Sequence, residues 1–439
     1  MMIVFSHPAF RTFAFGFAGL LSLAGADRAQ ADAQLLIEAS TGKVLHAENA
    51  TLPWYPASVT KLMTAYTTLR AVKEGRISVN TLLTVSRNAA AQQPTKMGFK
   101  IGTSVTVDNA LKMLMVKSAN DVAVTIAEGV GGSLEGFADL MNSNARRLGM
   151  TQSNFVNPNG LPAENHVSSA RDLAILARAL IREFPEYDGY WHISSIRYGN
   201  RVMRNYNSLI YRYPGADGMK TGFICASGYN VVASATRNGR RLIAVVLGSW
   251  SGAVRAQKAA QLLERGFNSG GLSWLTPSLG TVDALAPVDA QPPNLREEMC
   301  GGHRRKPPSE ENEEEPEESA SNASEESGNG QAFMLSGAKP AKFVLGPPVE
   351  TTPPVVVFTG PADRPDPVEQ IASATPKKKK KAAAKTDEST KPAKAAKKED
   401  AKSAKTAKPA KPAKKEDANS AKTAKPAKPA KPKVSSTTQ

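Results

Sequence analysis

Apolar residues near the start of the chain occur in short runs separated by a turn-like stretch. Residues 34–38 and 44–47 are rich in Leu, Ile and Val. Residues 40–43 between them read Ser-Thr-Gly-Lys, a composition typical of turns. Two short apolar runs joined in this way predict a β-hairpin.

The spacing of apolar residues becomes helical after Pro56. Residues 57–72 place Leu62, Met63, Tyr66 and Leu69 at the intervals of one helix face. Similar intervals predict further helices over residues 107–129, 133–148 and 171–182. The middle of the chain is therefore expected to be helical.

Strand-forming sequence returns near residue 229. Residues 229–236 and 242–247 are β-rich runs, and Asn238-Gly239 between them suits a tight hairpin turn. A last helix is predicted over residues 255–265. Strands at both ends and helices between them indicate an α/β fold, with one antiparallel sheet flanked by helices and an inserted helical lobe.

Composition divides the chain into four parts. Residues 1–31 have the basic residue, short apolar run and small residues of a signal peptide. Residues 32–268 have the composition of a globular domain. Residues 269–368 form a linker rich in Pro and Glu, and residues 369–439 form a Lys/Ala/Pro-rich tail. Linker and tail bury too little apolar surface to offset chain entropy, so we expect the C-terminal third to be disordered.

The positive charge of the chain is concentrated in this tail. Residues 377–433 contain 21 Lys and six acidic residues, which accounts for nearly all of the net charge of +16. We expect the tail either to contact anionic envelope polymers or lipid head groups, or to be a solvated spacer. The signal peptide argues against nucleic acid as its partner.

The two cysteines, Cys225 and Cys300, fall in different predicted parts, one in the domain and one in the linker. We therefore expect no disulfide between them. Neither lies near His or Asp at the spacing of metal ligands, so we expect no metal site and no cofactor.

Three short motifs offer candidate chemistry, and the first is Ser58-Val59-Thr60-Lys61. On a helix the serine and the lysine lie one turn apart, so the amine can take the proton of the hydroxyl. The same spacing recurs at residues 40–43 and 336–339, in the predicted turn and linker. Spacing alone therefore does not identify the nucleophile, because an ordinary amphipathic helix with an exposed lysine would look the same.

The other two motifs are Ser118-Ala119-Asn120 and Lys220-Thr221-Gly222. The first lies at the end of a predicted helix or in the following loop, where its hydroxyl could relay a proton and its amide could hold a carbonyl. Ser and Asn also cap helices, which is the simpler explanation. The second motif precedes a late strand, where a lysine beside glycine suits a carboxylate ligand, or merely a turn with a solvated lysine.

In this order, the three motifs resemble those of the penicillin-recognising serine enzymes. Their flanking residues look like the D-alanyl-D-alanine carboxypeptidases among the low-molecular-mass penicillin-binding proteins, and so do residues 159–161, 168–172 and 205–207. The resemblance covers residues 33–268 and implies a β-lactamase/transpeptidase-like fold. It also implies action on peptidoglycan stem peptides and inhibition by β-lactam antibiotics.

The resemblance implies a role for each matching residue. Ser58 would form an acyl-enzyme, Lys61 would be its general base, and Ser118 would pass a proton to the departing D-alanine. The backbone N–H groups of Ser58 and Phe223 would form an oxyanion hole. The substrate-binding residues that it implies are Asn120, Lys220, Thr221, Gly222, Phe223 and Arg255.

Departures from the family leave alternatives open. Several relatives have His in place of Phe223, and many have a β-rich second domain and a membrane-binding helix, neither of which we expect here. We expect a periplasmic protein, at most peripheral to the membrane or the wall. A D-alanyl-D-alanine endopeptidase is the nearest alternative, and a β-lactamase is less favoured because no Glu-containing deacylation loop is evident. An envelope-polymer-binding protein acting through the basic tail is the alternative from another class.

Overall fold

The computed structural model describes residues 32–269, 278–302, 345–347 and 352–366. All of these residues belong to one compact unit that runs to Ser373. The predicted signal peptide, residues 1–31, and the predicted tail, residues 369–439, lie outside the described residues.

A five-stranded antiparallel sheet forms the centre of this unit, in the order β2-β1-β9-β8-β7. Its strands are β1 (Ala33–Glu38), β2 (Val44–Glu48), β7 (Ala216–Ile224), β8 (Gly228–Arg237) and β9 (Arg240–Ser249). Ala33 of β1 pairs with Leu247 of β9, so strands from both ends of the domain lie side by side. The predicted hairpins are confirmed, and so is the antiparallel sheet formed from the two ends of the domain.

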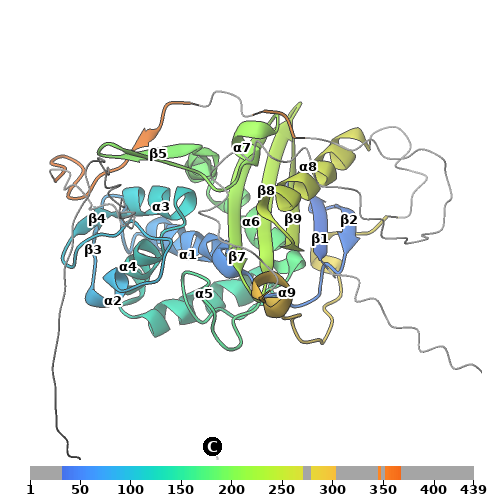
Figure 1. The fold of residues 1–439 in the computed structure, drawn as a ribbon, viewed down its shortest axis with the longest axis horizontal. Coiled ribbons are helices and arrows are strands. Elements are labelled where there is room, and N and C mark those ends of the chain that lie inside the picture. Colours follow the sequence, from blue (N-terminus) through green and yellow to red (C-terminus); the bar gives the residue numbers. More distant parts are fainter. Residues whose placement is uncertain (1–31, 270–277, 303–344, 348–351, 367–439) are drawn as a thin grey trace, which may run out of the picture. The chain divides into compact units, whose positions relative to one another are not determined.

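Both faces of the sheet are buried. Alternate side chains of β1, β8 and β9 pack either toward the lobe or against α8 (Gly252–Asn268), the predicted last helix. Figure 1 shows α8 lying across β8 and β9. Burial on both faces explains why β8 and β9 are near-continuous apolar runs instead of alternating apolar and polar residues.

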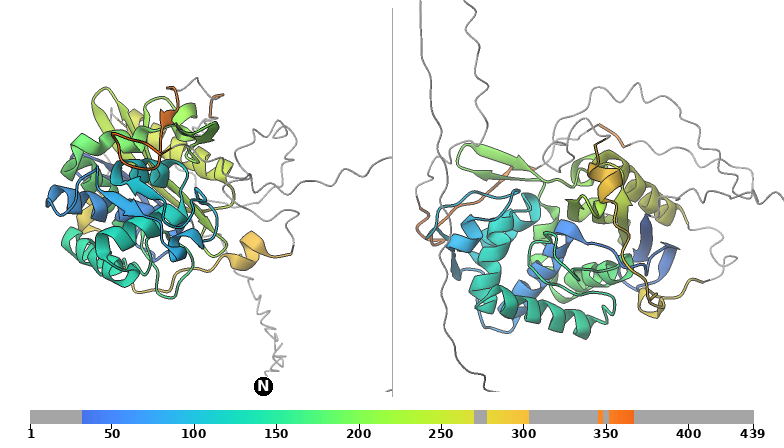
Figure 2. Two further views of the ribbon diagram at one scale, coloured as in Figure 1. Left: turned by 90° about the vertical axis from the view of Figure 1, so that its left-hand side faces the viewer. Right: turned by 60° about the horizontal axis from the view of Figure 1, so that its bottom comes forward.

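Between β2 and β7 the chain forms the predicted helical lobe. In Figure 1 and in the right-hand view of Figure 2, most of its helices, coloured blue to teal, lie beside the green strands, whereas the last of them lies behind the sheet in Figure 1 and packs on β9 and β1. The lobe contains η1 (Ala57–Thr60), α1 (Lys61–Lys73), β3 (Leu82–Thr84), α2 (Arg87–Ala90), β4 (Ser104–Thr106), α3 (Val107–Val116), α4 (Asn120–Gly131), α5 (Leu134–Leu148) and α6 (Ala170–Glu183).

Two of the predicted helices differ in detail from the observed ones. The helix predicted from residue 57 begins as the 3₁₀ turn η1 and becomes α-helical at Lys61. The helix predicted over residues 107–129 is two helices, α3 and α4, because Ser118 between them has a φ of 58°. A non-glycine residue in the left-handed region is uncommon and often marks a functional position.

A second sheet stands beside the lobe, in the order β10-β5-β6. Its strands are β5 (Ser195–Tyr198), β6 (Arg201–Arg204) and β10 (Val355–Val356), and the nearby short helices are η2 (Pro185–His192) and α7 (Leu209–Arg212). Strand β10 comes from the predicted linker and pairs with β5 (Figure 1). The expectation of disorder is therefore wrong for residues 352–366, where two valines add an edge strand and Val357 is buried.

The segment 278–302 also packs on the domain, contrary to the predicted boundary at residue 268. It contains η4 (Val282–Ala284) and α9 (Arg296–Cys300), with Val282 and Met299 fully buried. A disulfide joins Cys225 to Cys300, so the expectation that the two cysteines do not pair is wrong. Assigning Cys300 to a structureless linker caused the error, because composition did not indicate that this segment folds back.

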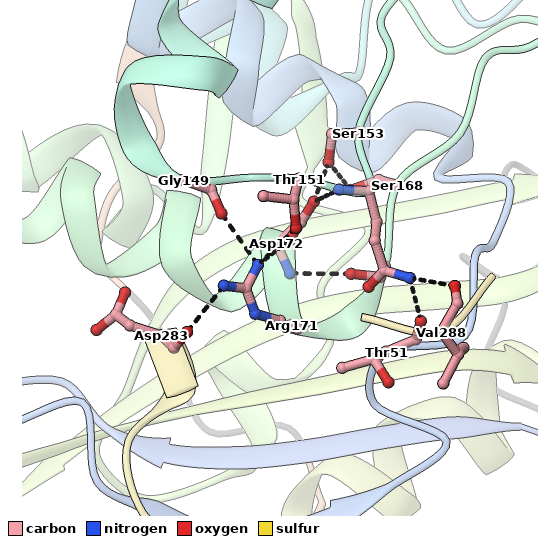
Figure 3. A network of polar contacts seen from close by, with 11 residues as sticks. Thr51, Gly149, Thr151, Ser153, Ser168, Arg171, Asp172, Asp283 and Val288 are labelled. Atoms are coloured by element: carbon pink, nitrogen blue, oxygen red, sulfur yellow. Dashed lines mark hydrogen bonds and ion pairs between the residues drawn. The ribbon is translucent and has the colours of Figure 1, made fainter. Parts of the chain in front are cut away.

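A buried polar network, drawn in Figure 3, anchors the same segment. Arg171 donates to the carboxylate of Asp172 at 2.7 Å and to the carbonyl oxygen of Asp283 at 3.0 Å. Gln152 donates to the carbonyl oxygen of Val288 at 3.0 Å. The segment therefore satisfies polar groups that the domain buries, as buried charges require.

No helix in the part of the chain that the structure describes is both long enough and apolar enough to span a bilayer.

Candidate active site

Ser58 lies in η1, and Lys61 begins α1 one turn later. Lys61 Nζ donates a 2.9 Å hydrogen bond to Ser58 Oγ. Lys61 is fully buried, whereas Ser58 is partly exposed. The structure therefore brings the first two predicted residues together, with a buried amine against a hydroxyl that a substrate can reach. In its neutral form such an amine can accept the serine proton.

Two further oxygens fix the orientation of the Lys61 amine. Nζ donates to Asn120 Oδ1 at 2.8 Å and to the carbonyl oxygen of Asn159 at 2.7 Å. With Ser58 Oγ these oxygens surround the amine on three sides. In the neutral form its two N–H groups can donate to the two oxygens while its lone pair faces Ser58 Oγ. Turning the amine away from Ser58 would break its hydrogen bonds to Asn120, the first residue of α4, and to the carbonyl oxygen of Asn159.

Ser118 and Asn120 form the turn between α3 and α4. Thr95 accepts from the Asn120 backbone N–H at 2.8 Å, and its hydroxyl donates to the Ser118 carbonyl at 2.9 Å. Asn120 Nδ2 donates to the carbonyl of Gln93 at 2.9 Å, so both ends of this amide have protein partners. Ser118 Oγ is buried and has no hydrogen-bond partner among the described residues. The turn thus places the Asn120 amide against Lys61, and it buries the Ser118 hydroxyl two residues earlier without a partner among the described residues.

Strand β7 runs directly against η1 at Gly222. A Cβ atom at this position would lie 2.8 Å from the Ser58 backbone nitrogen and 2.9 Å from that of Val59. A Cβ atom does not come so close to a backbone nitrogen, so only glycine lets the edge of β7 lie beside Ser58. A similar contact occurs at Gly160, where a Cβ would lie 1.9 Å from the carbonyl oxygen of Ala57.

The neighbours of Gly222 on β7 are largely buried. Lys220 is 1% exposed, which excludes the alternative of a solvated turn lysine, and its amine donates to the Thr221 carbonyl at 3.1 Å. Thr221 Oγ1 is buried and, like Ser118 Oγ, has no partner among the described residues. The Phe223 ring packs on Tyr229, with 4.4 Å between ring centroids.

Arg255 lies in the first turn of α8 and is 4% exposed. It donates to the carbonyl of Asn230 at 3.4 Å and to that of Tyr206 at 3.3 Å. Asn230 is the register partner of Gly222, so these bonds bring Arg255 to the stretch of β8 that pairs with the Lys-Thr-Gly strand.

The site also includes residues to which the sequence analysis gave no role. Lys117, next to Ser118, donates to the Tyr206 hydroxyl at 2.6 Å. Asn159 supplies a carbonyl to Lys61, and His166 is buried beside the same helix, where burial lowers the pKa of its imidazole to about 4. The sequences around residues 159 and 206 were part of the family resemblance, which was the available signal for them.

Hydroxyl, amine and amide groups make up this cluster. No three His, Cys, Asp or Glu side chains come together as a metal site within the described ranges.

Comparison with known proteins gives a consistent picture. A family model described as D-alanyl-D-alanine carboxypeptidase matches residues 22–251. The D-alanyl-D-alanine carboxypeptidase DacC of Escherichia coli is 37% identical over 244 residues, which cover 54% of this chain and 61% of that protein. The chain thus spans about three fifths of the length of such relatives.

Solved structures of penicillin-binding proteins show the same similarity. Penicillin-binding protein 6B from Escherichia coli matches with a TM-score of 0.52 and 35% identity, covering 54% of this chain and 77% of that one. Penicillin-binding protein D2 from Listeria monocytogenes, solved in a cefotaxime-bound form, matches with a TM-score of 0.50 and 29% identity, covering 54% and 98%.

Proposed function

The chain belongs to the D-alanyl-D-alanine carboxypeptidase family, and from this we propose that it is a serine carboxypeptidase that removes the terminal D-alanine from peptidoglycan stem pentapeptides. The observation that supports this most strongly is the 2.9 Å hydrogen bond between the buried Lys61 amine and Ser58 Oγ. It joins a nucleophile to a base at the place where β7 meets η1.

In the acylation step, neutral Lys61 takes the proton of Ser58 as Oγ attacks the carbonyl carbon of the D-Ala-D-Ala bond. The backbone N–H groups of Ser58 and Phe223 stabilise the resulting oxyanion. Ser118 relays a proton to the leaving nitrogen, the C–N bond breaks, and D-alanine departs. Ser118 Oγ is suited to this relay because no described residue occupies it.

Deacylation returns the enzyme to its starting state. Lys61 takes a proton from a water molecule as the water attacks the ester carbonyl, and this proton passes to Ser58 Oγ as the C–O bond breaks. The product is a stem peptide shortened by one residue.

The substrate's terminal carboxylate is assigned to the β7 edge. Lys220 supplies positive charge there, the Thr221 hydroxyl is available to donate, and Arg255 adds a second cation at the paired stretch of β8. Asn120 orients Lys61 and has one amide hydrogen left for a substrate carbonyl. A requirement for a free carboxylate is what separates a carboxypeptidase from a general peptidase.

β-Lactam antibiotics are proposed as inhibitors that acylate Ser58. The cefotaxime-bound form of the Listeria relative supports this by analogy. A penicillin adduct that persists would agree with the proposal, whereas rapid hydrolysis of the drug would indicate a β-lactamase instead.

Mass analysis of digested muropeptides tests the reaction itself. Purified enzyme incubated with pentapeptide muropeptides and with cross-linked dimers should remove one alanine from the pentapeptides and leave the dimers intact. Conversion of dimers to monomers without loss of the terminal alanine would instead establish the endopeptidase alternative.

Because the proposed substrate is peptidoglycan, we also propose that the enzyme acts outside the cytoplasmic membrane, in the periplasm. The Cys225–Cys300 disulfide supports this location, because disulfides persist in oxidising compartments. The predicted signal peptide, residues 1–31, would direct the export.

For the basic tail, residues 369–439, the proposal is contact with anionic envelope polymers or lipid head groups. Its support is the concentration of lysine there. Binding to isolated cell walls should fall with rising salt for the full chain and be weaker without the tail. Equal binding of both would leave the tail as a spacer.

A further inference from the structure

Residues 154–167 form a loop, here called the 154–167 loop, that lies against η1 and the start of α1. Its ends are joined by the bridge between Asn154 and Val167, with backbone hydrogen bonds of 2.9 and 3.1 Å. The loop is therefore a closed unit, and whatever fixes it on α1 also fixes the groups it presents there.

The 154–167 loop contacts the reacting end of α1 at three successive positions. The Asn159 carbonyl accepts from the Lys61 amine at 2.7 Å, and the Pro158 carbonyl accepts from the Thr64 hydroxyl at 2.5 Å. Gly160 lies against η1 so closely that no side chain fits. A shift of the loop would therefore move one of the oxygens that orient Lys61.

His166 joins the two ends of this arrangement. Its Nδ1 accepts the backbone N–H of Val156 at 3.0 Å, and its Nε2 lies 2.8 Å from the hydroxyl of Thr60. A backbone N–H can only donate, so Nδ1 is unprotonated, Nε2 has the hydrogen, and the ring donates to Thr60. The imidazole therefore links the start of the loop to the residue directly before Lys61.

We propose that His166 is a positioning residue that holds the Asn159 carbonyl against the Lys61 amine, through Thr60 on one side and Val156 on the other. The inference rests on the proposed function, since it concerns the activation of Ser58. Its physical basis is that catalysis by a positioned base is sensitive to displacements of about 1 Å.

The surroundings of His166 keep the ring in this neutral form. The side chain is 3% exposed, its ring packs edge-on against Phe155 with centroids 5.9 Å apart, and burial lowers its pKa to about 4. Both hydrogen bonds therefore persist across the neutral pH range. In this pH range His166 keeps one protonation state and one set of hydrogen bonds, so it does not act as a pH switch.

The test compares three variants by the second-order rate of acylation with a fluorescent penicillin and by melting temperature. His166→Phe removes both hydrogen bonds but keeps the ring shape, His166→Asn keeps an acceptor near the position of Nδ1, and Thr60→Val removes only the partner of Nε2. Tyr190→Phe is the control, because it removes a partly buried 2.8 Å hydrogen bond to Asp108, and neither residue belongs to the 154–167 loop.

We expect His166→Phe to acylate roughly 10- to 100-fold more slowly than wild type. His166→Asn and Thr60→Val, which each lose one bond, should slow by about fivefold. Tyr190→Phe should lose stability without slowing. Rescue by asparagine and normal rates in the control would separate positioning from a general loss of stability.

Wild-type rates in folded His166→Phe would overturn the inference, as would equal slowing by Tyr190→Phe. If His166→Phe does not fold, Thr60→Val decides: a wild-type rate overturns the inference and a reduced rate supports it. Failure of the wild-type protein itself to form a penicillin adduct would instead refute the proposed function.

Discussion

Two parts of the candidate site treat their polar groups in opposite ways. The activating part consists of Ser58, Lys61 and the oxygens of Asn120 and Asn159, and here the protein supplies a hydrogen-bond partner on all three sides of the amine nitrogen. The receiving part consists of the hydroxyls of Ser118 and Thr221, which are buried and have no partner among the described residues. The first part is assembled in advance, and the second is built for groups that come from outside.

The difference has a thermodynamic meaning. A buried hydroxyl without a partner costs about 1–3 kcal/mol of stability. The hydroxyls of Ser194 and Ser249 are also buried without a partner among the described residues, so it is the position of Ser118 and Thr221 beside Asn120 and Gly222 that connects their hydroxyls with a ligand. We therefore expect substitutions in the activating part to lower both activity and stability, because they break hydrogen bonds within the protein. Substitutions in the receiving part should lower activity without lowering stability.

The largest effect is expected for Lys61→Met, which removes the amine and leaves two buried oxygens without a donor. Acylation by penicillin should fall by roughly 10³-fold, within the range attributed to general bases, and the melting temperature should fall as well. The measurement is adduct formation against time by fluorescence, with circular dichroism to check folding. Rapid acylation of this variant would remove Lys61 from the mechanism.

The next largest effect is expected for Ser118→Ala. Turnover of pentapeptide should fall by about 10²-fold because proton relay is lost, while the melting temperature should stay the same or rise because an unpartnered polar atom is removed. Thermal unfolding and peptide hydrolysis measure the two quantities.

Ser153→Ala is the matched control for Ser118→Ala. Its hydroxyl is hydrogen-bonded to Ser168 and Asp172, both at 2.8 Å, so the change should lower stability and spare activity (Figure 3). If the two serine variants behaved alike, the distinction between the parts of the site would be wrong.

A smaller effect is expected from the disulfide, which ties α9 to the turn just after β7. The double change Cys225→Ser and Cys300→Ser should lower the free energy of unfolding by about 2 kcal/mol. Acylation should change little, because neither cysteine contacts Ser58 or Lys61 in the described structure. Chemical denaturation and penicillin labelling of the same samples would check both. If the double variant were fully folded but labelled much more slowly than wild type, the turn after β7 would have to be counted as part of the receiving part of the site.

The smallest effect is expected outside both parts, at Glu38 on β1. The hydrogen bond from Arg240, followed by that from Thr41, holds the pKa of this carboxyl below its usual range. A lowered folded-state pKa stabilises the fold above the usual pKa, and this contribution is lost as the pH falls below about 4. Glu38→Gln should cost a few tenths of a kcal/mol at neutral pH, as exposed pairs do.

Unfolding of wild type and Glu38→Gln across the pH range checks this. The difference between the two proteins should shrink on acidification. A difference that grew toward low pH would contradict the sign of the effect.

Much of the fold follows from local patterns. Apolar runs joined by turn residues predict the hairpins, and period-3.6 spacing predicts the lobe helices and α8, since these elements bury apolar side chains in the two hydrophobic clusters of the domain. Two things escape such patterns. The break at Ser118 depends on a left-handed residue held by Thr95, and the folding back of residues 278–302 depends on the Arg171 network and a disulfide. Both are contacts between residues distant in sequence.

The site divides in the same way. The Ser58–Lys61 pair is local, so its spacing predicts the 2.9 Å contact once a helix is assumed. The contributions of Asn159 and His166 depend on how the 154–167 loop lies on α1, which no spacing encodes. The need for glycine at position 222 appears only when β7 is seen against η1.

Covalent labelling with a fluorescent penicillin, comparing wild type with Ser58→Ala, is the most direct test of Ser58 as the nucleophile. We expect one adduct per wild-type molecule, located on the peptide that contains Ser58, and none on the variant. Equal labelling of both proteins would contradict the assignment of Ser58 as the nucleophile and the mechanism that rests on it.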